Sequence, residues 1–131
     1  MAWSQAKLRT RRRVCPVTVL GRLEGSQGYQ TVFTCSPPAV RSCLATPLSV
    51  GAATDTLYVE LYGTGIRGAA SVQCFVAGQS VPVFYAGQVA AYPGLDQVDI
   101  SIPKSLAGSG DVRVYVVADG VFSNVVGLKI Q

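Results

Sequence analysis

The sequence predicts an all-β domain, folded as a sandwich of about seven or eight short antiparallel strands. Three observations favour this class. Apolar and polar residues alternate from Tyr29 onward, and Gly, Pro, Asp and Asn interrupt the alternation about every ten residues. No segment shows the three- and four-residue apolar spacing of a sustained helix. Because each predicted strand has one apolar face, a second sheet must cover the first.

The strands are predicted in order along the chain. Residues 57–62 form a strand in which three aliphatic residues alternate with two tyrosines and a glutamate. Residues 72–76 and 81–85 are expected to pair as a hairpin around a turn over residues 77–80. Residues 98–102 form the next strand, in which aliphatic residues alternate with an aspartate and a serine.

The C-terminal hairpin is the clearest element. Residues 111–117 place three valines on one face, and residues 126–130 return along the sheet. Asp119-Gly120 supplies the turn, because both residue types tolerate positive φ. The helix-like segment Pro103–Ala107 is about one turn long.

Composition and charge define the domain organisation. With 131 residues, of which 49% are hydrophobic and 14% charged, the chain forms one domain with its own core. Five of the 11 Lys and Arg residues precede residue 14 with no acid among them, whereas residues 14–131 hold six basic and seven acidic residues. Residues 1–25 are predicted as a basic, partly ordered segment, and residues 26–131 as the sandwich. Because the domain is nearly neutral, no nucleic-acid partner is predicted.

Three absences exclude further classes. No apolar stretch approaches the roughly 18–20 residues that span a bilayer, so no transmembrane segment is expected. The apolar run Val14–Leu20 is short and contains Pro16, so no clear signal peptide is predicted. The chain has no histidine, which excludes His-based catalysis and most zinc and copper sites. Neither a metal site nor a cofactor is predicted.

The cysteines predict one disulfide. Cys35 and Cys43 bracket a Pro-rich connection, and a bond between them closes it as a loop that adds roughly 2–3 kcal/mol to the free energy of unfolding. Their spacing differs from the CxxC of redox and zinc sites. Cys74 shares the apolar face of its strand, which predicts a buried thiol. A four-cysteine zinc site requires Cys15 and Cys74 to converge, and the pairing of these two stays open. The predicted disulfide indicates an oxidising, extracytoplasmic compartment.

Five segments resemble a known bacterial module. They are LYGTGIRG (61–68), VFYAG (83–87), YPGLDQV (92–98), IPKSLAGSG (102–110) and DGVFSN (119–124). In these segments the chain resembles the C-terminal module of large uncharacterised proteins from Solibacter and other acidobacteria. The resemblance covers a little more than half of the chain, roughly residues 57–130. It implies an immunoglobulin-like β-sandwich related to IPT/TIG modules, at the end of an exported chain, and it implies no specific activity.

One candidate catalytic pair is available to a chain without histidine. Glycosidases use two carboxylates, one of them with a raised pKa. Glu60 lies between Tyr58 and Tyr62 on an otherwise hydrophobic strand, where burial would raise its pKa. Asp96, beside the Tyr92 turn, is its predicted partner. The competing interpretation is that Glu60 is an exposed strand carboxylate without a catalytic role.

The aromatic residues favour binding over catalysis. Tyr58, Tyr62, Phe84, Tyr85 and Tyr92 could form a flat amphipathic platform for a sugar ring or a protein strand, although core packing is an alternative role for some of them. An exposed edge strand offers a second route, by pairing with an adjoining domain or with a second copy of the chain. The sequence therefore predicts a non-catalytic extracytoplasmic adhesion or interaction module, with a small glycosidase as the alternative.

Overall fold

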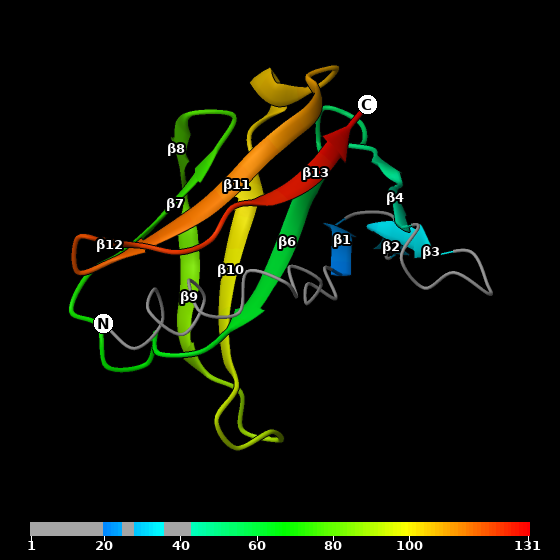
Figure 1. Cartoon of the computed structure of the whole chain (residues 1–131). Helices are drawn as coiled ribbons and strands as arrows, with labels where there is room; N and C mark the ends of the chain where they lie inside the picture. Colours follow the sequence, from blue (N-terminus) through cyan, green and yellow to red (C-terminus); the bar gives the residue numbers. More distant parts are fainter. Residues whose placement is uncertain (1–19, 25–27, 36–42) are drawn as a thin grey trace.

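The computed structural model describes residues 20–24, 28–35 and 43–131, which are largely β-structure (Figure 1). These residues form thirteen strand segments and one 3₁₀ turn, and they contain no α-helix. The predicted all-β class is confirmed. In this described part, no helix has the length and apolar character needed to cross a membrane.

One sheet has five strands, and every neighbouring pair in it is antiparallel. Their order across the sheet is β2 (Gly28–Thr31), β1 (Leu20–Glu24), β6 (Thr56–Gly63), β10 (Asp96–Ile102) and β9 (Val83–Gln88). β1 precedes the predicted domain boundary at residue 26, so the sheet begins before that boundary. Residues 1–19, which include the Arg-rich stretch and Cys15, lie outside the described residues.

The second sheet has six strands. Five of them follow the order β5 (Pro47–Leu48), β13 (Val126–Ile130), β11 (Gly110–Ala118), β7 (Val72–Val76) and β8 (Gln79–Val81), and β12 (Val121–Phe122) pairs with β11. β5 runs parallel to β13, whereas the other neighbours are antiparallel. A separate small hairpin joins β3 (Phe33–Cys35) to β4 (Cys43–Ala45).

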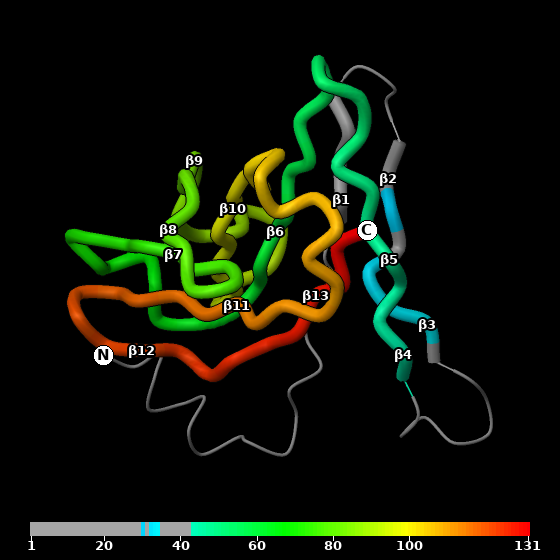
Figure 2. The backbone as a smooth tube through the Cα atoms, turned by 90° about the horizontal axis from the view of Figure 1, so that it is seen from above, coloured from blue at the N-terminus to red at the C-terminus, as the bar shows by residue number. Residues whose placement is uncertain are grey.

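Apolar side chains from both sheets meet in one hydrophobic core. β11 and β13 cross in front of β6 and β10 in Figure 1, and the view from above shows the same two layers (Figure 2). Alternate residues of each long strand point inward, as the period-two pattern predicts. Each buried aliphatic side chain contributes about 1.5–3 kcal/mol relative to an exposed one. The core includes Leu57, Val59, Leu61, Val98, Ile100, Ile102, Val112, Val114, Val116, Leu128 and Ile130.

Two tight turns use left-handed backbone at both central residues. Asp119 and Gly120 have φ values of 48° and 79° between β11 and β12, so the predicted Asp-Gly turn is confirmed. Ala77 and Gly78 have φ values of 52° and 77° between β7 and β8. The second turn is shorter than predicted, because Gln79 and Ser80 already belong to β8. The predicted pairing of residues 72–76 with 81–85 is wrong beyond residue 81, because residues 83–85 belong to β9, which pairs with β10 in the other sheet.

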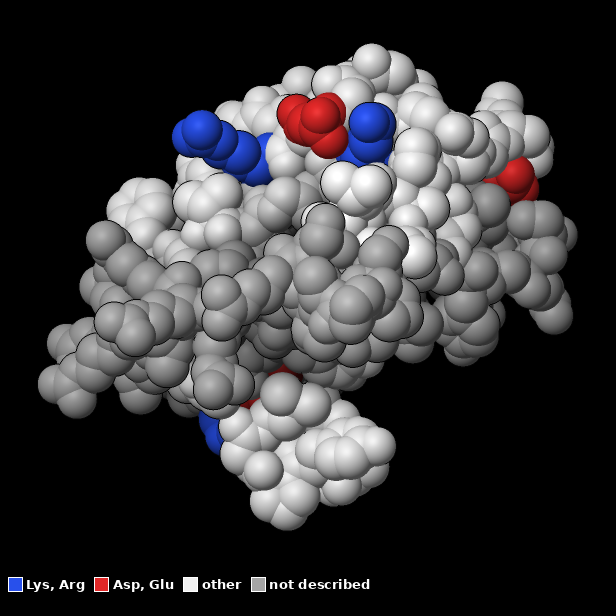
Figure 3. Space-filling view, turned by 45° about the vertical axis from the view of Figure 1, so that its right-hand side comes forward, with Lys and Arg blue, Asp and Glu red and all other residues white. Residues whose placement is uncertain are grey.

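The structure has more strand segments than the seven or eight expected, because five of the thirteen are only two or three residues long. Segments of that length are too short to show a period in the sequence. The predicted single helical turn is present as the 3₁₀ turn η1 (Lys104–Leu106), and Leu106 is buried there. Charged side chains are few and scattered on the face shown in Figure 3.

Candidate functional site

The candidate site lies on the outer face of β6, β10 and β9. On β6, Tyr58, Glu60 and Tyr62 alternate with buried aliphatic residues, so they point away from the core. The β6–β10 register places Tyr62 opposite Gln97 and Glu60 opposite Asp99, and the β10–β9 register places Tyr85 opposite Asp99. We name this surface the tyrosine–carboxylate face, formed by Tyr58, Glu60, Tyr62, Phe84, Tyr85, Gln97 and Asp99.

The centre of this face is a pair of carboxylates. Glu60 and Asp99 are directly opposite one another on adjacent strands, a geometry that places Cβ atoms about 4.5–5.5 Å apart. Each carboxylate accepts a hydrogen bond from its own strand. The Tyr62 hydroxyl donates to Glu60 Oε2 at 2.7 Å, and Gln97 Nε2 donates to Asp99 Oδ1 at 2.5 Å. These bonds fix both acids on the outer face.

The environment of the pair disfavours a second negative charge. Burial raises the pKa of the Asp99 carboxyl above its ordinary value, and the charge on Glu60 raises it further, while the hydrogen bond from Gln97 opposes the shift. Like charges directly opposite in a sheet destabilise the fold. A ligand that offers hydrogen-bond donors or a positive charge would relieve this repulsion.

Aromatic rings surround the carboxylates. The Tyr58 and Phe84 rings meet edge to face, with centroids 5.5 Å apart and planes at 71°. Phe84 is 62% exposed and Tyr85 is 42% exposed. Both side chains are exposed because a bulge interrupts the β9–β10 ladder, where Tyr85 pairs with Asp99 and Val83 pairs with Ile100.

Tyr85 has a fixed position on β9. Its hydroxyl donates to the Gln88 carbonyl oxygen at 2.6 Å. Its ring lies over Gly87, since a Cβ atom added to that glycine would lie 2.9 Å from the Tyr85 hydroxyl oxygen and 3.1 Å from Cζ. The missing side chain at residue 87 therefore lets the tyrosine lie along its own strand.

Tyr92 does not join this face. The structure brings Tyr58, Tyr62 and Tyr85 to the same side of the sheet, but Tyr92 lies in the loop that connects β9 and β10. The Val89 N–H donates to the Leu95 carbonyl at 2.9 Å and closes this loop, which leaves Tyr92 64% exposed. The five predicted aromatic residues thus form a group of four and one separate loop residue.

Asp96 has a structural environment on the inner side of the sheet. Its side chain is 1% exposed, and Oδ2 accepts hydrogen bonds from the backbone N–H groups of Ile66 at 2.7 Å and Arg67 at 3.2 Å. Arg67 Nε forms an ion pair with Oδ1 at 2.6 Å. Burial alone would raise the pKa of Asp96, but these hydrogen bonds and the Arg67 charge lower it below its ordinary value.

The structure does not bring Glu60 and Asp96 together. Glu60 points to the outer face of β6, whereas Asp96 pairs with Gly63 and is buried on the opposite side of the sheet. Asp99 instead lies beside Glu60. The sequence contained part of this information, because residues 96 and 99 are three positions apart and so face opposite sides of one strand.

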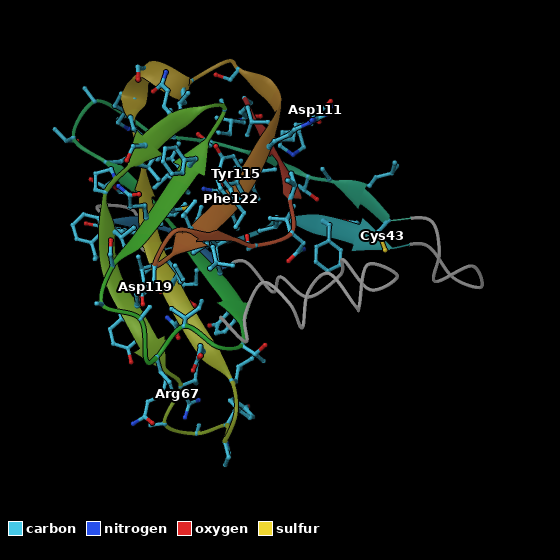
Figure 4. The ribbon with its side chains drawn as sticks, turned by 60° about the vertical axis from the view of Figure 1, so that its left-hand side comes forward. Cys43, Arg67, Asp111, Tyr115, Asp119 and Phe122 are labelled. Carbon is cyan, nitrogen blue, oxygen red and sulfur yellow. The ribbon has the colours of Figure 1, made fainter. Side chains whose placement is uncertain are left out.

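A second aromatic group, absent from the sequence predictions, lies on the outer face of the other sheet. Phe75 and Tyr115 are stacked with centroids 5.2 Å apart, and Tyr115 and Phe122 are 5.8 Å apart. Figure 4 shows Tyr115 and Phe122 side by side on β11 and β12. Their strands pair in the ladder, but no periodic pattern in the sequence links these three positions.

The described cysteines have different environments. Cys74 is a free, buried thiol, and burial raises its pKa to about 12, so it is not a nucleophile at neutral pH. Cys43 is not a free thiol, and it lies opposite Cys35 in the β3–β4 ladder. Opposite residues in such a ladder have Cα separations within the range for a disulfide. The Cys35 side chain lies outside the described ones, so the Cys35–Cys43 bond stays a prediction.

The comparisons with known proteins leave the function to be argued from this geometry. No protein-family model matches the sequence, and no curated protein or solved structure matches it significantly.

Among the residues that the structure describes, no three Cys, Asp or Glu side chains gather where they could hold a metal ion.

Proposed function

We propose that this chain is an immunoglobulin-like interaction module that binds a protein or glycan through its tyrosine–carboxylate face, outside the cytoplasm. The strand order supports the fold assignment. β1, β6, β10 and β9 follow the A-B-E-D order of one immunoglobulin sheet, and β7, β11 and β13 follow the C-F-G order of the other. The acidobacterial resemblance implies the same fold.

The observation that carries the binding proposal is the Glu60–Asp99 pair among exposed rings. Repulsion between the two acids costs stability. Arg22 on β1 lies opposite Tyr58 in the β1–β6 register, and its side chain is outside the described ones. Sugar hydroxyls, or a Lys or Arg side chain of a protein, would donate to the carboxylates while an apolar face stacks on the rings. The arrangement therefore suits a partner with donors next to an apolar surface.

The extracytoplasmic location rests on the cysteines. The β3–β4 register supports a Cys35–Cys43 disulfide, which is stable in oxidising compartments. Mass measurement after alkylation tests this bond. We expect two alkylated cysteines without reductant and four with it, and four without reductant would contradict the proposed compartment.

The binding test compares the wild-type chain with Glu60→Gln/Asp99→Asn and Tyr58→Ala on a glycan array and against Lys- and Arg-containing peptides. We expect a glycan or basic-peptide signal that falls at least tenfold in both variants, because they remove the acids or one ring. Asp111→Asn is the control, since Asp111 is an exposed acid on the other sheet. Binding that is unchanged in the two variants of this face, or that is lost in the Asp111→Asn control, would contradict the assignment of this face.

A glycosidase is the second candidate, now with Glu60 and Asp99 as its carboxylates. The raised pKa of Asp99 beside a second acid is the feature that favours it, since one acid of a glycosidase must hold its proton. Chromogenic glycosides test this candidate. Turnover lost in both Glu60→Gln and Asp99→Asn would replace the binding proposal, and absence of turnover in the wild-type chain would exclude the tested glycosides as substrates.

A further inference from the structure

β9 ends its sheet and has an open edge. It pairs with β10 on one side, and no strand pairs with its other side within the described ranges (Figure 1). An edge strand presents a row of backbone N–H and C=O groups that can pair with another chain. This edge is a different surface from the tyrosine–carboxylate face, although Phe84 and Tyr85 border both.

The hydrogen bonds show which residues of β9 point outward. The Val89 N–H donates to the Leu95 carbonyl oxygen. Val89 and Leu95 therefore form a hydrogen-bonded pair, directly after the Gln88–Asp96 pair in the antiparallel register. Because hydrogen-bonded and non-hydrogen-bonded pairs alternate, Tyr85 and Gly87 direct their backbone groups to β10, and Ala86 and Gln88 direct theirs to the open edge. The Tyr85 hydroxyl reaches the Gln88 carbonyl oxygen at 2.6 Å, which agrees with this orientation.

The usual protection of an edge is largely missing from β9. The edge strands of the other sheet are only two and three residues long, and Pro47 and Pro82 lie within or directly after them. β9 has six residues and contains no proline and no charged residue. Two features limit pairing along this edge: the bulge at Phe84, and the Tyr85 hydroxyl, which already occupies the Gln88 carbonyl. Neither feature involves the backbone groups of Ala86.

We propose that β9 pairs antiparallel with β9 of a second copy of this chain, around a twofold axis at Ala86. In this register the N–H of Ala86 donates to the C=O of the partner's Ala86, and the reverse bond also forms. A second copy fits because β9 has no charged side chain, so two β9 strands can pair without like-charge repulsion. For the same reason, β9 offers no charge that would favour a peptide of opposite charge over a second β9. The twofold axis uses each edge once, so the product is a dimer and not a fibre.

The dimer joins the two sheets edge to edge and places their tyrosine–carboxylate faces on one continuous surface. A partner with repeated groups would then bind with avidity. The pairing is weak, because the bulge restricts the regular part of the edge to Tyr85–Gln88.

Sedimentation velocity of the full chain from micromolar to millimolar concentration tests the pairing. We expect the wild-type chain to shift from monomer to dimer. Ala86→Pro removes a donor that only the partner uses, so this variant should stay monomeric with an unchanged dichroism spectrum. Ala86→Gly keeps the donor and should dimerise.

Hydrogen exchange gives a second measurement that does not depend on a variant. The amide of Ala86 should exchange more slowly at high concentration, whereas the amide of Val89, already bonded to the Leu95 carbonyl, should not change. A wild-type chain that is monomeric at millimolar concentration, or a dimer with no concentration-dependent protection at Ala86, would overturn the inference. Glu60→Gln/Asp99→Asn should still dimerise, so failure of the binding proposal and failure of this one are distinguishable.

Discussion

Arg67 and Asp96 join the start of β10 to the connection after β6. Arg67 Nε lies 2.6 Å from Asp96 Oδ1, and Arg67 Nη2 donates to the Leu95 carbonyl at 3.1 Å. The same carboxylate also accepts the backbone N–H groups of Ile66 and Arg67, so one buried acid holds the middle of the connection against the start of β10. Figure 4 shows Arg67 at the end of the sheet, beside the loop that carries Tyr92.

Asp96→Ala is expected to lower the free energy of unfolding by about 2–4 kcal/mol, because it leaves three donors without their acceptor and removes the partner of Arg67. Urea denaturation measures this change. Asp111→Ala, an exposed carboxylate on the other sheet, is the control and should change stability by less than about 0.5 kcal/mol. A loss at Asp96 no larger than that of the control would contradict the structural role.

The pKa of Asp96 predicts a loss of stability in acid. Its folded-state pKa is lowered, so its contribution is complete above the unfolded-state pKa of about 3.9 and is lost as the pH falls toward the folded-state value. Denaturation curves at a series of pH values below neutrality measure this loss. Asp96→Asn should be less stable than the wild-type chain at neutral pH, and the difference between them should shrink in acid.

Asp99 should behave in the opposite way. Its folded-state pKa is raised, so its ionised form reduces stability above that pKa, and the penalty disappears as the pH falls below about 3.9. Asp99→Asn is therefore expected to stabilise the neutral-pH fold by about 0.2–1 kcal/mol, measured by urea denaturation. In the Glu60→Gln background, Asp99→Asn should raise the free energy of unfolding by a smaller amount, because the repelling charge is already absent. Equal gains in both backgrounds would show that the two acids do not interact.

Ala77→Asn is expected to stabilise the β7–β8 turn by about 0.5–1 kcal/mol. Ala77 has a φ of 52°, a conformation that costs an alanine energy and that asparagine adopts more readily. Thermal unfolding measures the gain. Ala90→Asn, in an exposed loop without positive φ, is the matched control and should leave the melting temperature unchanged. A lower melting temperature for Ala77→Asn than for the wild-type chain would contradict this role of the turn.

Gly87→Ala is expected to displace the Tyr85 ring and break its hydrogen bond to Gln88, with a loss of about 1 kcal/mol. Gly127→Ala is the control, because a Cβ atom there meets nothing within 4 Å. In the Tyr85→Ala background, Gly87→Ala should no longer lower the free energy of unfolding. A loss that persists in this background would show that it arises from the backbone at residue 87 and not from the Tyr85 ring. Urea denaturation of the four proteins completes this cycle.

The alternation in residues 57–62 and 98–102 was sufficient to predict two central strands and their inward faces, because it depends on burial along one strand. The pairing of Glu60 with Asp99 was not predictable in the same way. It depends on the register between strands that are more than thirty residues apart, and period two is compatible with many registers. The same reason explains why the Phe75, Tyr115 and Phe122 group was missed, since three different strands bring it together.

The parallel pairing of β5 with β13 has a consequence for a chain under tension. Lys129 pairs with Pro47, Ile130 pairs with Leu48, and the Gln131 N–H donates to the Leu48 carbonyl at 3.0 Å. Force applied upstream of Pro47 and downstream of Gln131 acts along these two parallel strands in opposite directions. It therefore shears all their hydrogen bonds at once and does not open them one after another, so this contact resists pulling more than its short length suggests.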